Sequence, residues 1–379
     1  MPQGFETTEF KARLTGAQSR MNAADLDAIL LTTEPDIRYF TGYLTRFWES
    51  PCRPWFLVLP RSGDPIAVIP SIGAALMART WITDIRTWRA PDLEDDGISL
   101  LAETLRDLGP RIGTPSGLQS HLRMPLGDFA RLNAALPQPI GADADILRSL
   151  RLVKSEAEIE KIKTACQIAT RAFERVPEIA RIGQPLAPVF RDFQRLCLDE
   201  GADWVPYLAG AAAPGGYGDV ISPADDRPLE AGDVLMLDTG LVHDGYFCDF
   251  DRNFSVGSPS PDVAAGNSRL IEATYAAFEA ARPGATAAEL FHVMDKIVTG
   301  GAGGSEAGRY GHGLGMNLTE WPSLIPTEHT PLVEGMVLTL EPGIELAPGR
   351  ALVHEENIVI RENGAEWLSQ PYGAEMIRI

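Results

Sequence analysis

The stretch VLMLDTGLVHDGYFCDFDRNF, residues 234–254, decides the fold of the second half of this chain. The Asp-Gly pair at 244–245 is typical of a hairpin turn, so the apolar runs on either side are predicted to be antiparallel strands. Side chains alternate between the faces of a strand, which puts Asp249 and Asp251 on one face and Asp238 on the adjacent strand near Asp249. Carboxylates held this close repel one another unless a cation lies between them.

Three more polar residues stand in comparable settings further along the chain. His312 lies within GHGLG, Glu341 opens the turn EPG after an apolar run, and Glu356 lies within HEENIVI. Buried carboxylates are costly unless they are paired or bound to metal. A polar hairpin with one solvated face is the alternative, and the apolar neighbours disfavour it. The sequence therefore predicts a divalent-cation centre with five ligands: Asp238, Asp249, His312, Glu341 and Glu356.

Composition limits the class of protein. The chain has 379 residues, a formal net charge of −19 and 45% hydrophobic residues. This length predicts two domains, and the acidic balance argues against nucleic acid and anionic membranes as partners. We find no apolar run long enough for a membrane span and no signal peptide. The cysteines, including Cys52, are scattered without metal-type spacing, which indicates reduced thiols in the cytoplasm.

The chain is predicted to divide near residue 150 into two α/β domains, 1–150 and 151–379. The first alternates strands expected at 26–31, 55–60 and 65–70 with an amphipathic helix at 97–108, and a turn is expected at 34–36. In the second, Ser155 with Glu158 and Thr286 with Glu289 form capping boxes that predict helix starts.

These motifs, in this order, resemble the metal signature of the pita-bread metallohydrolases, the M24 superfamily that includes methionine aminopeptidase, aminopeptidase P, prolidase and creatinase. The resemblance covers essentially the whole chain. It implies a creatinase-like N-terminal α/β domain and a C-terminal pita-bread α+β domain that contains the site. Family members of this kind form homodimers, so a homodimer is expected here as well.

The resemblance also implies roles for the five ligands around two divalent ions, which the ligand types restrict to Mn, Co, Zn or Fe. Asp238 would bind one ion, and Asp249 with Glu356 would bridge both. His312 and Glu341 would complete the other ion, and Glu341 would also accept the proton of the attacking water. Thr339 and Asn357 are candidates to support these ligands through hydrogen bonds.

The chain departs from the peptidases in the residues that handle the substrate. Thr319 stands where prolidase-like enzymes carry a histidine, and the loop that contains Tyr217 lacks their Pro-His-Gly. His354 could replace a lost oxyanion donor, which makes it a second candidate catalytic residue; alternatively, it is hydrogen-bonded to a carboxylate. Asp251 adds a carboxylate where the peptidases have threonine, and a salt bridge to Arg252 or another local arginine is the simpler interpretation.

Several residues are candidates to contact the substrate. Phe47 and Trp48 are expected to wall the pocket, although packing within their own domain is an equally simple interpretation. The remaining candidates flank the predicted metal motifs: Tyr217, Thr319, Glu320 and Trp321.

Three functions remain open from the sequence. The first is a metal-dependent hydrolase of the Xaa-Pro dipeptidase or aminopeptidase P type that cleaves short peptides. The second is a non-peptidase member acting on a small metabolite, similar to dimethylsulfoniopropionate lyase, ectoine hydrolase or creatinase. The third is a non-catalytic binding module, which the complete ligand set disfavours.

Overall fold

The computed structural model describes residues 4–50, 54–305, 307–373 and 375–379, and Cys52 lies outside them. Contacts between residues group the protein into two compact units, Met1–Arg151 and Leu152–Ile379.

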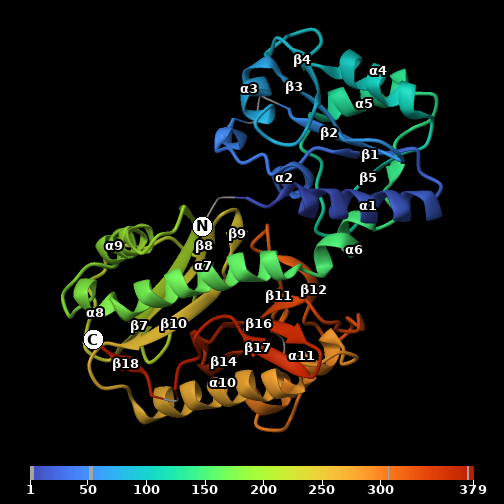
Figure 1. The fold of residues 1–379 in the computed structure, drawn as a ribbon. Helices are drawn as coiled ribbons and strands as arrows, with labels where there is room; N and C mark the ends of the chain where they lie inside the picture. The colour runs from blue at the N-terminus through green and yellow to red at the C-terminus, as the bar shows by residue number, and fades with distance from the viewer. Residues whose placement is uncertain (1–3, 51–53, 306, 374) are drawn as a thin grey trace. The chain divides into compact units, whose positions relative to one another are not determined.

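The first unit is built on a mixed sheet with strand order β4-β3-β2-β1-β5-β6 (Figure 1). Its strands are β1 (Ala28–Leu31), β2 (Phe56–Pro60), β3 (Ile66–Pro70), β4 (Asp84–Trp88), β5 (Ile112–Thr114) and β6 (Gly141–Ala142). Its helices are α1 (Thr7–Ala23), α2 (Glu34–Thr41), α3 (Ala74–Met77), α4 (Ile98–Leu108), α5 (Leu126–Ala135) and α6 (Ile146–Leu152), with short 3₁₀ turns at Phe47–Glu49 and Ser71–Gly73.

The apolar pattern of the first 150 residues explains this sheet. Alternating side chains of β1, β2 and β3 belong to one hydrophobic core. Leu101 and Leu105 of α4 pack on this core. The strands and the amphipathic helix expected from the sequence are present, with bounds shifted by one or two residues. The turn expected at 34–36 is wrong, because these residues begin helix α2. Pro35 lies in the first turn of that helix. Backbone N–H groups there have no acceptor within the helix, so proline, which has no N–H, loses no hydrogen bond.

The second unit contains two larger sheets with strand orders β18-β10-β8-β7 and β12-β11-β13-β16-β17. Its strands are β7 (Trp204–Pro214), β8 (Asp233–His243), β9 (Tyr246–Phe247), β10 (Phe250–Ser255), β11 (His312–Gly313), β12 (Glu320–Ser323), β13 (Val337–Leu340), β14 (Gly343–Ala347), β15 (Arg350–Val353), β16 (Glu356–Arg361), β17 (Gly364–Trp367) and β18 (Ile377–Arg378).

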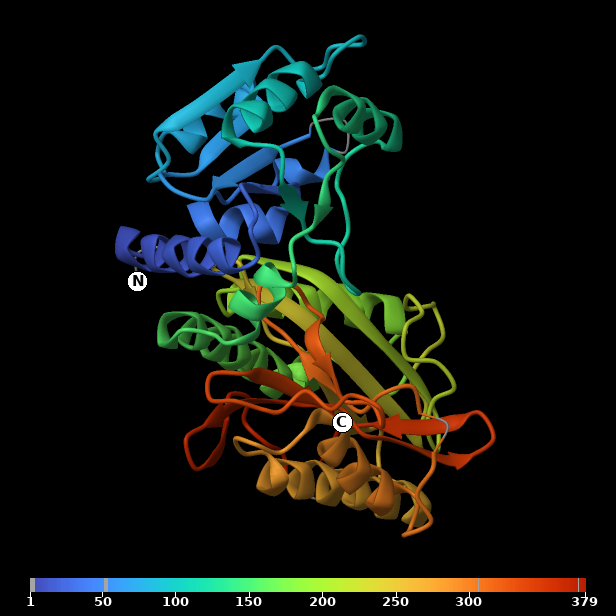
Figure 2. The same cartoon turned by 90° about the vertical axis from the view of Figure 1, so that its right-hand side faces the viewer.

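Helices cover the two sheets of this unit. They are α7 (Glu156–Glu174), α8 (Val176–Ile179), α9 (Leu186–Asp199), α10 (Pro261–Ala280) and α11 (Ala287–Val298). α7 and α9 pack on β7, β8 and β9, whereas α10 packs on β13, β14, β15 and β17. Figure 2 shows α10, in orange, running along the red strands of the C-terminal part. In the described part of the chain, no helix combines the length and apolar character needed to cross a membrane.

The sequence signals for helix starts and for the hairpin are confirmed. The Ser155 and Thr286 hydroxyls accept from the N–H groups of Glu158 and Glu289, and both capping boxes are complete. Asp244 turns the chain with φ of 46°. β8 and β10 are antiparallel, and their register places Asp251 directly opposite Asp238. The hairpin therefore brings its carboxylates to one face of the sheet, as the strand period predicts.

Candidate metal centre

His312 forms the short strand β11 with Gly313, and its neighbours fix the orientation of the ring. The His312 N–H donates to Oγ1 of Thr339 at 3.1 Å, and Nδ1 lies 2.8 Å from the carbonyl oxygen of Gly313. A carbonyl oxygen can only accept a hydrogen bond, so Nδ1 carries the proton. The lone pair of Nε2 is then available to bind a metal. Nε2 lies 3.4 Å from Oδ2 of Asp249 and 3.9 Å from Oε2 of Glu341.

Asp249 lies just before β10, where Asn357 of β16 holds its backbone. The Asp249 N–H donates to Oδ1 of Asn357 at 3.0 Å, and the amide of Asn357 donates back to the Asp249 carbonyl. The Cys166 thiol of α7 lies 3.3 Å from the same Oδ1. Asn357 therefore ties the two sheets together, while the carboxylate of Asp249 is left to face His312. Thr339 and Asn357 thus have the supporting contacts that the sequence suggested.

Glu355 joins these two residues to form a buried group. One ligand atom from each of Asp249, His312 and Glu355 lies within 4.8 Å of the others. All three side chains are almost fully shielded from solvent. An imidazole nitrogen and two carboxylate oxygens at these separations are arranged as one face of a coordination shell.

Glu341 stands at the rim of this group, directly after β13. Its Oε1 accepts from Nε of Arg309 at 3.1 Å, and its side chain is 20% exposed. Glu341 is therefore the carboxylate of the group that both approaches His312 and reaches solvent. The Arg309 guanidinium beside it is 38% exposed and places a positive charge at the rim.

Asp238 lies on β8 behind Asp249. The hydroxyl of Tyr207, on β7, donates to its Oδ2 at 3.0 Å, and this orients the carboxylate. Nothing in the sequence singled out Tyr207, because the pairing of β7 with β8 depends on a register that only the folded chain reveals.

The electrostatics of the group indicate a shortage of positive charge. Burial raises the pKa of Asp238 well above its ordinary value, and the negative charge of Asp249 adds to the shift. Burial, with the charges of Asp249 and Glu341, does the same to the pKa of Glu355. Burial alone would lower the pKa of His312, but its hydrogen bond to Asp249 and the charge of Glu341 outweigh burial and raise it.

The residues fit a bound divalent cation. Among the described residues, three buried carboxylate oxygens in this region have no hydrogen-bond partner, namely Oδ1 of Asp238, Oδ1 of Asp251 and Oε1 of Glu355. Unpaired buried anions are costly, and metal coordination removes that cost. An oxygen-rich set with one imidazole suits Mn, Co, Zn or Fe, and the ligand types do not choose between them.

Comparison with known proteins agrees with this geometry. Residues 160–362 match the model of metallopeptidase family M24, and residues 13–153 match the creatinase/prolidase N-terminal domain. The chain belongs to metallopeptidase family M24. It is thus a metallohydrolase with a creatinase-type N-terminal domain and a pita-bread domain, and the family implies divalent metal ions.

Individual relatives extend over nearly the whole length. The chain is 31% identical over 365 residues to a Mycobacterium tuberculosis protein named "Probable dipeptidase PepE", covering 95% of this chain and 94% of the relative. The solved dipeptidase PepE of Mycobacterium ulcerans superposes with a TM-score of 0.85 at 31% identity, covering 99% of each chain. The prolidase of Thermococcus sibiricus, at 23% identity, shares the fold with a TM-score of 0.88, covering 99% of this chain and all of that one.

The expectation for Glu356 does not agree with the structure, which places Glu355 beside Asp249 and His312 instead. Glu355 lies directly before β16 and Glu356 is the first residue of that strand, and the two side chains have different neighbours. Glu356 is fully buried on the other side, where Oε2 accepts from Arg252 at 3.0 Å and from the hydroxyl of Ser369. Two consecutive glutamates were the available signal, and the motif alone did not distinguish between them.

The expectation that His354 is catalytic does not agree with the structure either. His354 shares the side of Glu356, and its Nε2 lies 3.5 Å from Oε1 of that residue. Burial, assisted by the charge of Arg252, lowers the pKa of His354 to about 3, so the ring is neutral. Among the described residues Nε2 makes no hydrogen bond, so the alternative, a histidine hydrogen-bonded to a carboxylate, is met only as this close approach to Glu356.

Two expected substrate contacts are occupied within the protein. Tyr217 is 1% exposed, and its hydroxyl donates to Oδ1 of Asn253 at 3.0 Å and accepts from the Val353 N–H at 2.7 Å. Glu320 is 2% exposed and pairs with Lys154 at 3.1 Å. Neither side chain is open to a substrate, so the structure gives both a structural role.

The other expected contacts remain accessible or lie in the first unit. Thr319 and Trp321 are half-buried on either side of Glu320. Phe47 and Trp48 belong to the first unit, where both rings pack on Trp55 with centroid distances of 6.1 and 5.8 Å. This packing favours the alternative interpretation for Phe47 and Trp48, namely contacts within their own domain.

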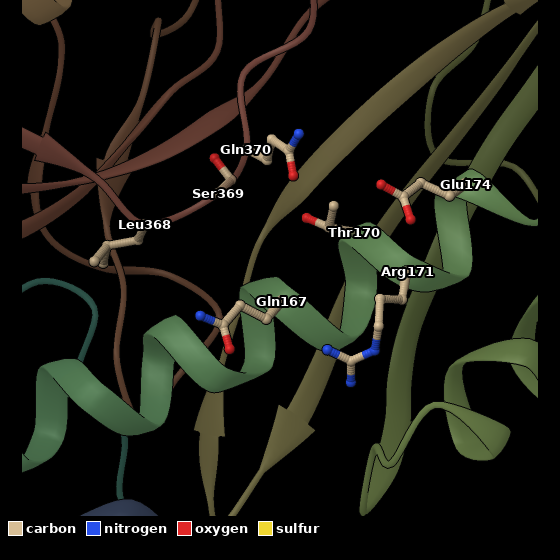
Figure 3. A pocket seen from close by; sticks show the side chains of 7 residues that line it. All are labelled: Gln167, Thr170, Arg171, Glu174, Leu368, Ser369 and Gln370. Carbon is tan, nitrogen blue, oxygen red and sulfur yellow. The ribbon is translucent and has the colours of Figure 1, made fainter.

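A separate pocket of about 330 Å³ lies between α7 and residues 368–370 (Figure 3). None of the candidate metal ligands lines it. Ser369 does, and its hydroxyl donates to Glu356, so Glu356 lies next to this pocket. The lining residues are polar apart from one leucine: Gln167, Thr170, Arg171, Glu174, Leu368, Ser369 and Gln370.

Proposed function

We propose that this metallohydrolase cleaves short peptides of the Xaa-Pro dipeptide type, with two divalent ions held by Asp238, Asp249, His312, Glu341 and Glu355. The observation that carries the proposal is the buried group of Asp249, His312 and Glu355, whose ligand atoms lie within 4.8 Å of one another. The relatives named dipeptidase and Xaa-Pro dipeptidase, which align along more than 90% of this chain, support a dipeptide substrate.

The proposed roles of these residues follow from their exposure to solvent. Asp249 and Glu355 are buried and would hold the ions, whereas Glu341 reaches the solvent side and would accept a proton from water. Bound ions would lower the pKa of that water and polarise the scissile carbonyl. Arg309 holds Glu341 in place and puts a positive charge where a substrate carboxylate can arrive.

The test is release of free proline from a panel of Xaa-Pro dipeptides by protein reconstituted with Mn²⁺. We expect release that depends on metal and disappears in Asp249→Asn. A matched control is Asp219→Asn, which changes an exposed loop carboxylate that is not among the proposed ligands. Metal binding without release of proline from any dipeptide would refute this substrate class.

Thr319 supports a second candidate function. It stands where the prolidase-like enzymes carry a histidine, and His354 does not replace that histidine in the structure. A small metabolite without a peptide bond, such as a cyclic amidine or a sulfonium zwitterion, would need no such donor. The same metal-loaded protein, inactive on dipeptides but active on such compounds, would establish this alternative.

A homodimer and a cytoplasmic location complete the proposal, and both rest on the resemblance to the family. Light scattering coupled to size-exclusion chromatography measures the first directly. A mass equal to one chain, 41.1 kDa, would refute the dimer.

A further inference from the structure

Asp251 is a buried carboxylate on the same sheet face as the candidate ligand Asp238. The register of β8 and β10 pairs the two residues directly, and directly paired residues project to the same face. Asp251 is 1% exposed. Threonine stands at this position in the peptidases that the chain resembles, so the family signature does not account for this carboxylate.

The contacts of Asp251 compensate its charge only in part. Its Oδ2 lies 3.4 Å from Nδ2 of Asn253, a long hydrogen bond, and its Oδ1 has no partner among the described residues. The charge of the adjacent Arg252 and the backbone N–H of Glu355 favour the ionised carboxylate, but burial outweighs them. In the described part of the chain, no ion pair with Arg252 forms. Nη1 of Arg252 donates to the backbone carbonyls of Asp251 and Glu355, and Nη2 donates to Glu356 and to the carbonyl of Gln370. The salt bridge that the sequence suggested for Asp251 is therefore absent from these contacts.

The unpartnered oxygens of this region belong to neighbouring residues. Oδ1 of Asp238 and Oε1 of Glu355 also lack a hydrogen bond within the described residues. Ionised carboxylates whose shielded oxygens lack partners are costly side by side, and a cation among them removes that cost.

We propose that Asp251 is an additional metal ligand, which gives the Asp238 side of the centre an all-oxygen set of Asp238, Asp249, Asp251 and Glu355. The inference rests on the proposed metal centre. His312 would bind only the ion on the opposite side of the centre, and Glu341 would complete the ligands of that ion. An all-oxygen set with extra negative charge favours hard ions such as Mn²⁺ or Mg²⁺, whereas the imidazole side accepts Zn²⁺ or Co²⁺ readily. The two positions therefore differ in the ion that they prefer.

The test is calorimetric titration of metal-free protein with Mn²⁺, comparing the wild type with Asp251→Asn and Asp251→Thr. We expect two ions per chain in the wild type. In both variants we expect affinity at one position to fall about tenfold or more, as ligand charge is lost, while the other position keeps its affinity. Repeating the titration with Zn²⁺ should show a smaller difference between variant and wild type.

Thermal unfolding separates ligation from a structural role. Without metal, Asp251→Asn removes an incompletely compensated buried charge and should raise Tm; with saturating Mn²⁺ it removes a ligand and should lower Tm. Asp251→Thr carries the residue of the peptidases and should behave in the same way, so the test does not depend on one variant folding. A Tm shift of the same sign with and without Mn²⁺, or unchanged Mn²⁺ binding, overturns the inference.

The outcomes also separate this inference from the proposed function. A wild type that releases proline, with variants that bind Mn²⁺ as the wild type does, would leave the function standing and overturn the role of Asp251. A wild type that binds Mn²⁺ through Asp251 but releases no proline would support the role of Asp251 and overturn the dipeptide substrate. A wild type that binds no Mn²⁺ overturns both.

Discussion

Glu355 and Glu356 are adjacent in the chain but lie in opposite electrostatic environments. Glu355 faces Asp249 and His312, and its Oε1 has no hydrogen-bond partner among the described residues. Glu356 faces Arg252, whose Nη2 donates to it at 3.0 Å. An uncompensated carboxylate is a candidate ligand, whereas a paired one stabilises the fold, so the two should respond differently to the same substitution.

We predict that Glu355→Gln loses metal binding without losing stability in the metal-free state, because it removes an uncompensated charge. Glu356→Gln should bind metal but should lower the free energy of unfolding by about 3 kcal/mol, because it leaves Arg252 buried without its partner. Urea unfolding of both metal-free variants, together with Mn²⁺ titration, measures the contrast. Loss of Mn²⁺ binding in Glu356→Gln alone would restore the original assignment from the sequence.

Glu341 gives the second prediction at this scale. Glu341→Gln keeps an oxygen near His312 but removes the base, so we expect kcat to fall by about 10²–10⁴. Metal content, measured by atomic emission, should fall much less than the rate. Full activity in this variant would assign proton transfer to another group.

The candidate site could be predicted from the sequence where a motif fixes both the residue and its direction. Asp249 and His312 sit in turns and strands whose period is readable, and their ligand atoms lie close together in the structure, whereas Asp238 stays a predicted ligand on β8. Glu355 was missed because a one-residue change of register exchanges the faces of a strand, and the sequence HEEN allows either choice. Tyr207 was missed because its contact depends on strands that are far apart in the sequence.

At the scale of elements, β11 shows how closely a backbone must pass to place a ligand. A Cβ atom at Gly313 would lie 1.9 Å from the carbonyl oxygen of Trp321 on β12, a clash that no rotamer relieves. The strand can therefore pass between β12 and β13 only with glycine at this position, and this passage positions His312.

We predict that Gly313→Ala lowers the free energy of unfolding by about 2 kcal/mol and weakens metal binding, because β11 must move and His312 moves with it. Gly308→Ala is the matched control: it lies nearby in sequence, and a Cβ there has no atom within 4 Å. Differential scanning fluorimetry and Mn²⁺ titration compare the two. Equal effects from both substitutions would contradict the close-approach argument.

The starts of β1 and β5 carry an ion pair that gives a prediction on pH. Asp27, just before β1, accepts from Nη2 of Arg111 at 2.8 Å and from Nε at 3.1 Å. The side-chain hydrogen bond from Arg111 lowers the pKa of Asp27 from 3.8 to about 2. A lowered acid pKa means that the pair stabilises the fold above about pH 4 and stops doing so as pH falls through 2.

Asp27→Asn should therefore lower the Tm at pH 6, by the equivalent of about 1 kcal/mol because Arg111 is partly exposed. The difference between variant and wild type should shrink as the pH approaches 2. Melting curves at pH 6, 4 and 2.5 measure this. A constant difference across this range would show that the effect is not electrostatic.

Element-scale features were predictable where local chemistry decides them. The capping boxes of α7 and α11 and the Asp-Gly turn were visible, because each depends on a few adjacent residues. The helix at α2 was missed because Pro35 was interpreted as part of a turn, although proline is equally suited to the first turn of a helix. The partners of each strand in the two large sheets required the folded chain.

At the scale of the whole molecule, the proposed ligands come from both large sheets of the second unit. Asp238 and Asp251 lie on β8 and β10, and Asp249 directly precedes β10; His312 lies on β11 of the other sheet, and Glu355 directly precedes β16. Without metal, the buried carboxylates repel one another across this boundary, and Asn357 is the contact that joins the two sheets near Asp249. A bound cation would turn this repulsion into a link between the sheets.

Metal removal should therefore loosen both sheets of the second unit and leave the first unit unchanged, because no proposed ligand lies in Met1–Arg151. At a metal concentration of 100 times Kd, binding stabilises the folded state by about 2.7 kcal/mol, which slows amide exchange through global opening by about 100-fold. Hydrogen-exchange mass spectrometry with Mn²⁺ or with EDTA measures the effect peptide by peptide. Protection should rise in peptides from β8, β10, β11 and β16 together, and not in those from β1 to β6. Protection confined to one of the two sheets would mean that the ions do not connect them, and that the ligands assigned to the other sheet do not bind metal.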